Sequence, residues 1–194
     1  HNGIIENHDD LRAYLKAEGI RFSTQTDTEV IGHLIRTFTE KGQSFEKAVF
    51  NTIKKLKGAY ALGIIDKNNP EQIIGVRNQS PLVLGKGFEE NFIASDVMAL
   101  APVTNKFVYL DDGQVALLTN QKAVVKNISS KIVRTKTHEV DSNAYTNDMA
   151  GYSHFMEKEI FEQPEAVKKS IEGRLTKHDT QEGIFGAAVS YTHL

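Results

Sequence analysis

The chain has 194 residues and no cysteine, with a hydrophobic share of 40%, a charged share of 25% and a formal net charge of −2. This length suffices to bury a full core in one domain, and the missing thiols exclude disulfides, thiolate metal sites and thiol chemistry within these residues. The small, dispersed net charge argues against binding to nucleic acid or to an anionic membrane, and no apolar run approaches the ~20 residues of a membrane helix. We therefore expect a cytoplasmic protein.

The first third of the sequence predicts three helices, because apolar residues recur there at helical spacing between capping and stop signals. The expected helices run over residues 8–18, from residues 26–29 to Gly42, and over residues 45–56. Asn7 and Ser44 are placed to cap the first and the third helix. Thr26 and Glu29 have the spacing of a capping box for the second.

Short apolar runs separated by turn residues predict strands along most of the remaining chain. Strands are expected over residues 20–23, 59–65, 72–76, 82–85, 91–94, 106–110, 115–118, 123–126 and 132–140. Asp112-Gly113 lies between two apolar runs and predicts a hairpin, and a hairpin turn is also expected at residues 85–87. Ser95-Asp96 can cap a short helix at 97–100. Helices followed by a long run of antiparallel strands indicate an α+β domain.

The C-terminal part of the sequence differs in character from the rest. From about residue 141 it becomes polar, and it then predicts a helix over residues 154–161 and a second that restarts at Pro164 and runs to residue 172. We expect three regions: a domain over residues 1–145, a connector over 146–183, and a non-native or disordered tail over 184–194.

Two short polar features are candidate site residues. Asn2-Gly3 can aim a side-chain amide and a backbone N–H at one point, as an oxyanion hole requires, although Asn-Gly is also a common turn dipeptide. Asp27 is suited to bind an ammonium group, or simply to support a helix N-terminus. Residue chemistry alone favours the turn and the helix cap over the two site roles, and it points to no metal site.

Longer runs of the sequence resemble one enzyme family. Residues 1–7 (HNGIIEN) are similar to the glutamine-site segment of the glutamine–fructose-6-phosphate aminotransferase (isomerizing) family. Residues 154–164 (HFMEKEIFEQP) resemble the segment that joins the glutaminase domain of this family to its sugar-phosphate isomerase domain. Between them, further runs follow in the family's order over residues 26–31, 57–61, 80–85 and 90–96. The resemblance covers about residues 1–183.

The resemblance implies a class II glutamine amidotransferase domain with the N-terminal-nucleophile fold, a four-layer αββα sandwich. In that family an N-terminal cysteine attacks the side-chain amide of L-glutamine with its own α-amino group as base, and an acyl-enzyme forms. The released ammonia converts fructose 6-phosphate to glucosamine 6-phosphate in the isomerase domain. The resemblance implies no cofactor, and it implies a homo-oligomeric parent enzyme.

By matching position, the side chain of Asn2 and the backbone N–H of Gly3 would form the oxyanion hole, and Asp27 would hold the glutamine ammonium group. The family's nucleophilic cysteine, its arginine for the glutamine carboxylate and its isomerase domain have no counterpart in these 194 residues. We therefore expect an N-terminally truncated, inactive part of the enzyme, with residues 1–145 as the C-terminal part of the glutaminase domain. The alternatives are another class II amidotransferase, such as an amidophosphoribosyltransferase or an asparagine synthetase, and a non-catalytic binding module on the same scaffold.

Overall fold

The computed structural model describes residues 1–140 and 149–172, and the chain divides into two compact units, residues 1–145 and 146–194. The helices of the first unit are α1 (His8–Ala17), α2 (Thr28–Glu40), α3 (Phe45–Ile53) and the short 3-10 helix η1 (Val97–Ala99). Its strands are β1 (Asn2–Gly3), β2 (Tyr60–Asp66), β3 (Asn69–Asn78), β4 (Val83–Lys86), β5 (Asn91–Ala94), β6 (Lys106–Tyr109), β7 (Gln114–Leu118), β8 (Ala123–Asn127) and β9 (His138–Glu139). The three predicted helices and most of the predicted strands are confirmed.

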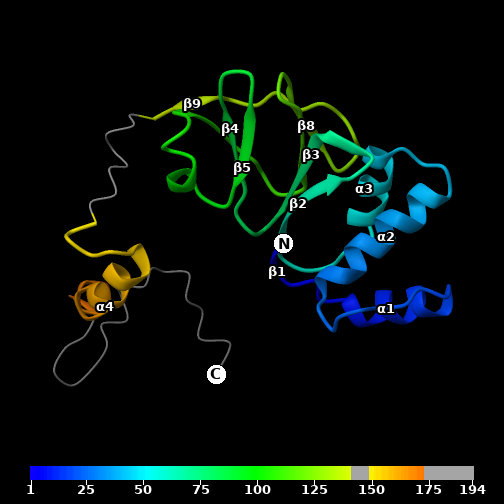
Figure 1. The fold of residues 1–194 in the computed structure, drawn as a ribbon, viewed down its shortest axis with the longest axis horizontal. Coiled ribbons are helices and arrows are strands. Elements are labelled where there is room, and N and C mark those ends of the chain that lie inside the picture. The colour runs from blue at the N-terminus through cyan, green and yellow to red at the C-terminus, as the bar shows by residue number, and fades with distance from the viewer. Residues whose placement is uncertain (141–148, 173–194) are drawn as a thin grey trace, which may run out of the picture. The chain divides into compact units, whose positions relative to one another are not determined.

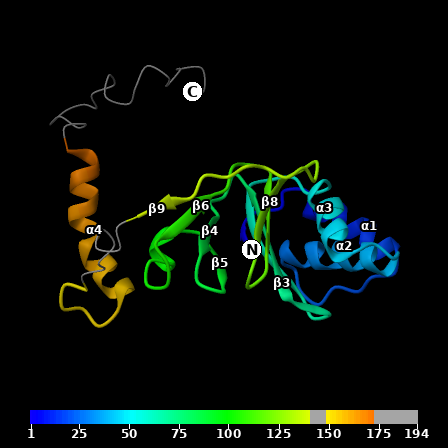
Figure 2. The ribbon, with the colours of Figure 1, turned by 90° about the horizontal axis from the view of Figure 1, so that it is seen from above.

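The strands of the first unit form two antiparallel sheets. In the described residues, one sheet has the order β1-β2-β3-β7-β8 and the other the order β5-β4-β6-β9. Figure 1 shows α1, α2 and α3 on one side of the five-stranded sheet and the strands β4 and β5 on the other, and the view from above in Figure 2 agrees. The layers therefore run helices, sheet, sheet.

Alternation along the strands supplies the two main cores. Leu62 and Ile74 are buried among the helix residues on one face of the five-stranded sheet. Ala61 is buried on the opposite face, together with Leu84 and Val108 of the second sheet. Because successive side chains of a strand point to opposite faces, neighbouring residues such as Ala61 and Leu62 serve different layers. This arrangement confirms the predicted α+β class with two stacked sheets.

The outer face of the four-stranded sheet has a small core of its own. Val83 and Phe107 are buried there against Val97 and Leu100, which belong to η1 and the residue after it. Asp96 caps η1 by accepting a hydrogen bond from the N–H of Met98 at 2.7 Å, as the sequence predicts. Within residues 1–140, η1 is the helix that covers this face.

The predicted hairpin at Asp112-Gly113 is wrong. The strands before and after it, β6 and β7, lie in different sheets, so the turn carries the chain from one sheet to the other. Gly113 donates its N–H to the carbonyl of Arg77 at 2.9 Å, and Asp112 accepts from the N–H of Gln79 at 2.9 Å. These two bonds attach the turn to the end of β3, so the residues of the turn bond to β3 and not to each other's flanking strands as in a hairpin. The hairpin predicted at residues 85–87 does form between β4 and β5, but its turn lies over residues 87–90, because Gly85 and Lys86 still pair with β5.

Two other predicted strands differ from the structure. Residues 20–23 form no strand, since the backbone donors at the end of this segment bond to the carboxylate of Glu29 instead of to a neighbouring strand. Of the strand expected over residues 132–140, β9 (His138–Glu139) pairs with β6, and Ile132 makes a single bridge to Lys126.

The described part of the second unit contains one helix, α4 (Phe155–Ile171). Two helices divided at Pro164 were predicted, but the helix continues through this proline. The carbonyl of Ile160, which loses its helical donor to the proline ring, lies on an exposed helix, so water can satisfy it. None of the helices in residues 1–140 and 149–172 has both the length and the apolar character needed to cross a bilayer. The predicted tail over 184–194 lies outside the described residues.

Candidate functional site

The N-terminal segment lies along β2 as a continuous backbone pairing. Asn2 and Gly3 pair with Ala61 and Tyr60 of β2, and Ile4 then donates its N–H to the carbonyl of Ala59 at 2.8 Å. The pairing continues to residue 6, whose N–H donates to the carbonyl of Lys57 at 2.9 Å. Ile5 is fully buried in the helix-side core. The first residues are therefore held by both backbone bonds and core packing.

Two glycines permit this close pairing. Gly3 has φ +100, and a Cβ there would lie 2.0 Å from the carbonyl oxygen of Ala59. Gly58 has φ +120, and its Cβ would lie 2.2 Å from the carbonyl oxygen of Ile4. No side chain fits at either position, because both the backbone angle and the space exclude it. The turn that the Asn-Gly dipeptide suggested is wrong, since both residues belong to the strand β1.

Asp27 lies at the start of α2 and reaches across to the N-terminal segment. Its Oδ2 accepts the N–H of Ile5 at 2.8 Å, and its Oδ1 lies 3.9 Å from Nδ1 of His1. The side chain of Asp27 makes no cap bond to α2, so the simple capping alternative is also wrong. The structure thus brings the segment that carries Asn2 and Gly3 against the partly buried Asp27 carboxylate.

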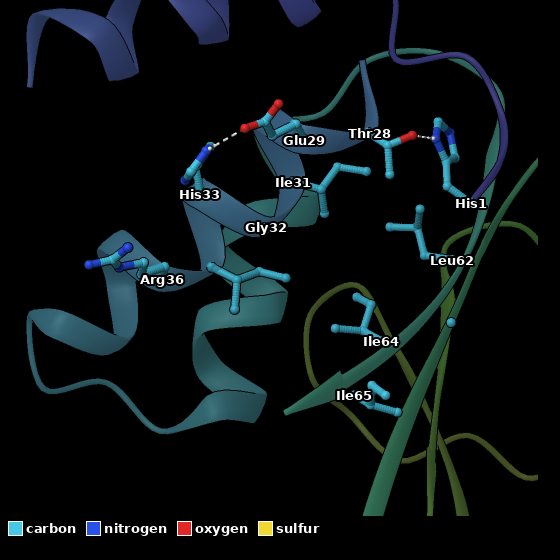
Figure 3. Close-up of a pocket in the computed structure, with 12 residues that line it drawn as sticks. His1, Thr28, Glu29, Ile31, Gly32, His33, Arg36, Leu62, Ile64 and Ile65 are labelled. Carbon is cyan, nitrogen blue, oxygen red and sulfur yellow. Dashed lines mark hydrogen bonds and ion pairs between the residues drawn. The ribbon is translucent and has the colours of Figure 1, made fainter. Parts of the chain in front are cut away.

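His1 supports the same junction. Its side chain is 6% exposed, and its Nδ1 hydrogen-bonds with Oγ1 of Thr28 at 2.7 Å, as Figure 3 shows. A cavity of about 520 Å³ opens beside this contact, between α2 and β2, with Ile31, Leu62 and Ile64 in its wall. The exposed wall is mainly apolar, and its polar side chains come from His1 and from Thr28, Glu29, His33 and Arg36 of α2.

The N–H groups of the N-terminal segment alternate in direction. Ile4 and Glu6 donate toward residues 57–59, whereas Ile5 between them donates to Asp27. Alternation of this kind is the rule in extended antiparallel backbone. The N–H groups of Ile4 and Glu6 therefore hold the segment against residues 57–59, whereas the N–H of Ile5 faces the side on which Asp27 lies.

Asn7 has a structural task that its sequence position does not reveal. Its side chain makes no cap bond to α1. Instead its Nδ2 donates to the carbonyl of Lys55 at 2.9 Å, and its Oδ1 accepts the N–H of Lys57 at 2.9 Å. The amide therefore continues the backbone pairing past residue 6, and its partners lie about 50 residues away in the sequence, where no local pattern predicts them.

Sequence reasoning also missed the network around Glu29. Its carboxylate accepts hydrogen bonds from the N–H groups of Ser23 and Thr24, both at 2.7 Å, and from Oγ1 of Thr24 at 2.6 Å. The Thr24 hydroxyl, followed by the Ser23 N–H, lowers the pKa of Glu29 from 4.5 to about 2, because these donors favour the charged form. The capping-box spacing drew attention to Glu29 but indicated a different partner, Thr26.

Comparison with known proteins agrees with this architecture. A family model described as a glutamine amidotransferase domain matches residues 1–102, more than half of the 194 residues. The chain belongs to this glutamine amidotransferase family.

Curated relatives are more specific. Over 176 residues the chain is 44% identical to the glutamine–fructose-6-phosphate aminotransferase (isomerizing) of Vibrio vulnificus strain CMCP6. It is likewise 44% identical over 179 residues to the protein of the same name from Escherichia coli K12. Each match covers 91% of this chain and 29% of the relative. The chain thus spans less than a third of the length of these relatives, and the similarity identified from its motifs is confirmed.

Solved structures extend the comparison to the fold. The chain is similar to the glutamine phosphoribosylpyrophosphate amidotransferase of B. subtilis, with a TM-score of 0.58 and 26% identity over 69% of this chain and 29% of that one. A second structure, described as the allosteric regulatory enzyme of purine biosynthesis, matches with a TM-score of 0.56. The predicted N-terminal-nucleophile type of fold is confirmed.

Proposed function

We propose that residues 1–145 form part of a glutaminase site, and that the protein to which they belong transfers ammonia from L-glutamine to fructose 6-phosphate. The observation that carries the proposal is the hydrogen bond from Ile5 to Asp27, which joins Asp27 to the segment that carries Asn2 and Gly3. The 44% identity to isomerizing aminotransferases over 91% of the chain supports the choice of acceptor.

Asn2 and Gly3 are proposed to bind the oxyanion that forms when the glutamine amide is attacked. Because successive N–H groups of the segment alternate in direction, the N–H of Gly3 would face the same side as the N–H of Ile5, which is the side of Asp27. The exposed side-chain amide of Asn2 can supply a second donor. In other enzymes the removal of one such donor raises the barrier by ~3 kcal/mol. Asp27 is proposed to bind the α-ammonium group of glutamine, for which a partly exposed carboxylate at the same junction is suited.

The reaction needs a nucleophile that these 194 residues do not contain, since they include no cysteine. In the proposed mechanism a cysteine thiol attacks the side-chain amide carbon while its α-amino group takes the thiol proton and passes it to the amide nitrogen, so that ammonia leaves and a thioester remains. Water then hydrolyses the thioester to glutamate and regenerates the thiol. Asn2 and Gly3 act on the intermediate, and Asp27 acts on the bound substrate. The chain alone is accordingly expected to release no glutamate from glutamine.

The second unit of the chain fits the same proposal as a connector. We propose that residues 146–183 lead from the glutaminase domain toward a sugar-phosphate isomerase domain, in a cytoplasmic homo-oligomer. Support comes from residues 154–164, which resemble the family's joining segment, and from α4, which has no buried residue. A helix with apolar side chains such as Phe161 exposed is suited to contact a further domain.

A chimera tests the proposal. Residues 1–172 replace the matching segment of the E. coli relative, and the chimera and the unmodified relative are assayed for glutamate release and glucosamine 6-phosphate formation. We expect both products from the chimera and neither from the 194-residue chain alone. Glutamate release without glucosamine 6-phosphate would favour a different class II amidotransferase as the parent. A folded chimera that releases no glutamate would favour a binding module and refute the proposal.

A further inference from the structure

Two charged side chains bond to the backbone of the segment before α2, one to its carbonyl groups and the other to its N–H groups. We propose that Arg12 and Glu29 are positioning residues that fix the place and orientation of Asp27 for the glutamine ammonium group. The inference rests on the function proposed above, and it adds two residues to the site that neither touch the substrate nor belong to the motif around residues 1–7.

Glu29 holds the donors of this segment. Its Oε1 accepts the N–H of Ser23 at 2.7 Å and lies 3.1 Å from Nε2 of His33, while its Oε2 accepts both the N–H and the hydroxyl of Thr24. Both carboxylate oxygens are thus engaged, and the side chain is 17% exposed. The lowered pKa of Glu29 keeps these bonds charge-assisted at neutral pH.

Arg12, from α1, holds the acceptors of the same segment. Its Nη1 donates to the carbonyl of Thr24 at 2.9 Å, and its Nη2 donates to the carbonyl of Thr26 at 2.6 Å. The guanidinium carbon also lies 4.4 Å from the centre of the Phe22 ring. A planar guanidinium that donates from two nitrogens and stacks on a ring has a fixed orientation. Because Arg12 belongs to α1, its bonds hold the segment in a fixed position relative to α1.

The segment between these side chains contributes little to the core, because residues 23–26 are exposed. Its held backbone ends at Thr26, immediately before Asp27, whose side chain then bonds to Ile5. A loop that buries no apolar side chain would ordinarily be mobile. The main effect of the charged hydrogen bonds from Arg12 and Glu29 to this segment is therefore to fix the position of the Asp27 carboxylate.

The test uses the chimera with Glu29→Gln, Arg12→Lys and the control Glu40→Gln. Glu40 pairs with Arg36 at 2.7 Å on the exposed side of the same helix, so its substitution removes a comparable charge without touching the loop. Glu29→Gln and Arg12→Lys are expected to raise KM for glutamine about tenfold, with kcat and KM for fructose 6-phosphate within about twofold. Glu40→Gln should leave all three constants within about twofold.

A double-mutant cycle with Asp27→Asn completes the design. If Glu29 acts through Asp27, adding Glu29→Gln to Asp27→Asn should raise KM by less than about twofold. A merely structural role predicts a lower melting temperature and a smaller active fraction with KM unchanged, and that result would overturn the inference. If Asp27→Asn raises KM but neither Glu29→Gln nor Arg12→Lys does, this inference fails and the proposed function stands. If Asp27→Asn leaves KM unchanged, or the unsubstituted chimera is inactive, the role of Asp27 and this inference fall together.

Discussion

The close approach of the N-terminal segment to residues 57–59 predicts that Gly58→Ala is far more costly than a comparable substitution elsewhere. A Cβ at Gly58 meets the carbonyl oxygen of Ile4 at 2.2 Å and the N–H nitrogen of Glu6 at 3.1 Å, so the segment must move away. The positive φ costs ~1 kcal/mol for an alanine, and the two backbone hydrogen bonds of residues 4 and 6 are worth ~1 kcal/mol each. We expect a loss of about 3 kcal/mol in the free energy of unfolding.

Gly42→Ala is the matched control for this substitution. Gly42 also follows a helix and has φ +80, but a Cβ there meets nothing within 4 Å, so only the backbone term of ~1 kcal/mol applies. Urea unfolding of the 194-residue chain, followed by far-ultraviolet circular dichroism, measures both losses. Equal losses within about 0.5 kcal/mol would show that the segment yields without cost, and would refute the argument for a tightly held N-terminus.

Three further predictions concern single side chains. Asn7→Ala should lower the free energy of unfolding by about 2 kcal/mol, since two backbone groups lose their partner; a loss below 0.5 kcal/mol by urea unfolding would contradict this. Thr52→Val should raise it by about 1 kcal/mol, because the buried Thr52 hydroxyl has no hydrogen-bond partner among the described residues; a loss of stability would count against the assignment. The pKa of Glu29 is lowered from 4.5 to about 2, so the stability that its hydrogen bonds contribute should be fully present above pH 4.5 and lost as the pH falls toward 2. The amide resonances of Ser23 and Thr24, followed by NMR against pH, report the titration of this carboxylate. A midpoint near pH 4.5 would refute the network.

Local signals in the sequence predicted most of the secondary structure. Ser44 caps α3, as its position indicates, by accepting the N–H of Lys47 at 3.4 Å, and the helix periods and short apolar strands are also local patterns. The partner of a strand is not local. Asp112-Gly113 has the composition of a hairpin turn, yet its neighbours join different sheets, because their pairing depends on strands far away in the sequence.

The candidate site shows the same division. Asn2, Gly3 and Asp27 were predicted as site residues because the motifs around them resemble a known family, whereas residue chemistry alone favoured a turn and a helix cap. Both simple alternatives failed for one reason: the partners of these residues lie elsewhere in the chain, at Tyr60 for Gly3 and at Ile5 for Asp27. Capping and turn preferences depend only on residues that are adjacent in the sequence. They therefore predict the wrong local structure at positions whose hydrogen-bond partners lie far away in the sequence.

If Asp27 binds glutamine as proposed, the hydrogen bond from Ile5 to Asp27 also links the integrity of the domain to that binding. It joins residues 22 positions apart, and a carboxylate that loses it is free to rotate away from an incoming ammonium group. Fraying of the first residues and loss of the binding geometry are then one event, described by one local opening equilibrium. Apparent glutamine affinity would fall by the fraction of molecules that are open, and bound glutamine would in turn protect the amide of Ile5 from hydrogen exchange.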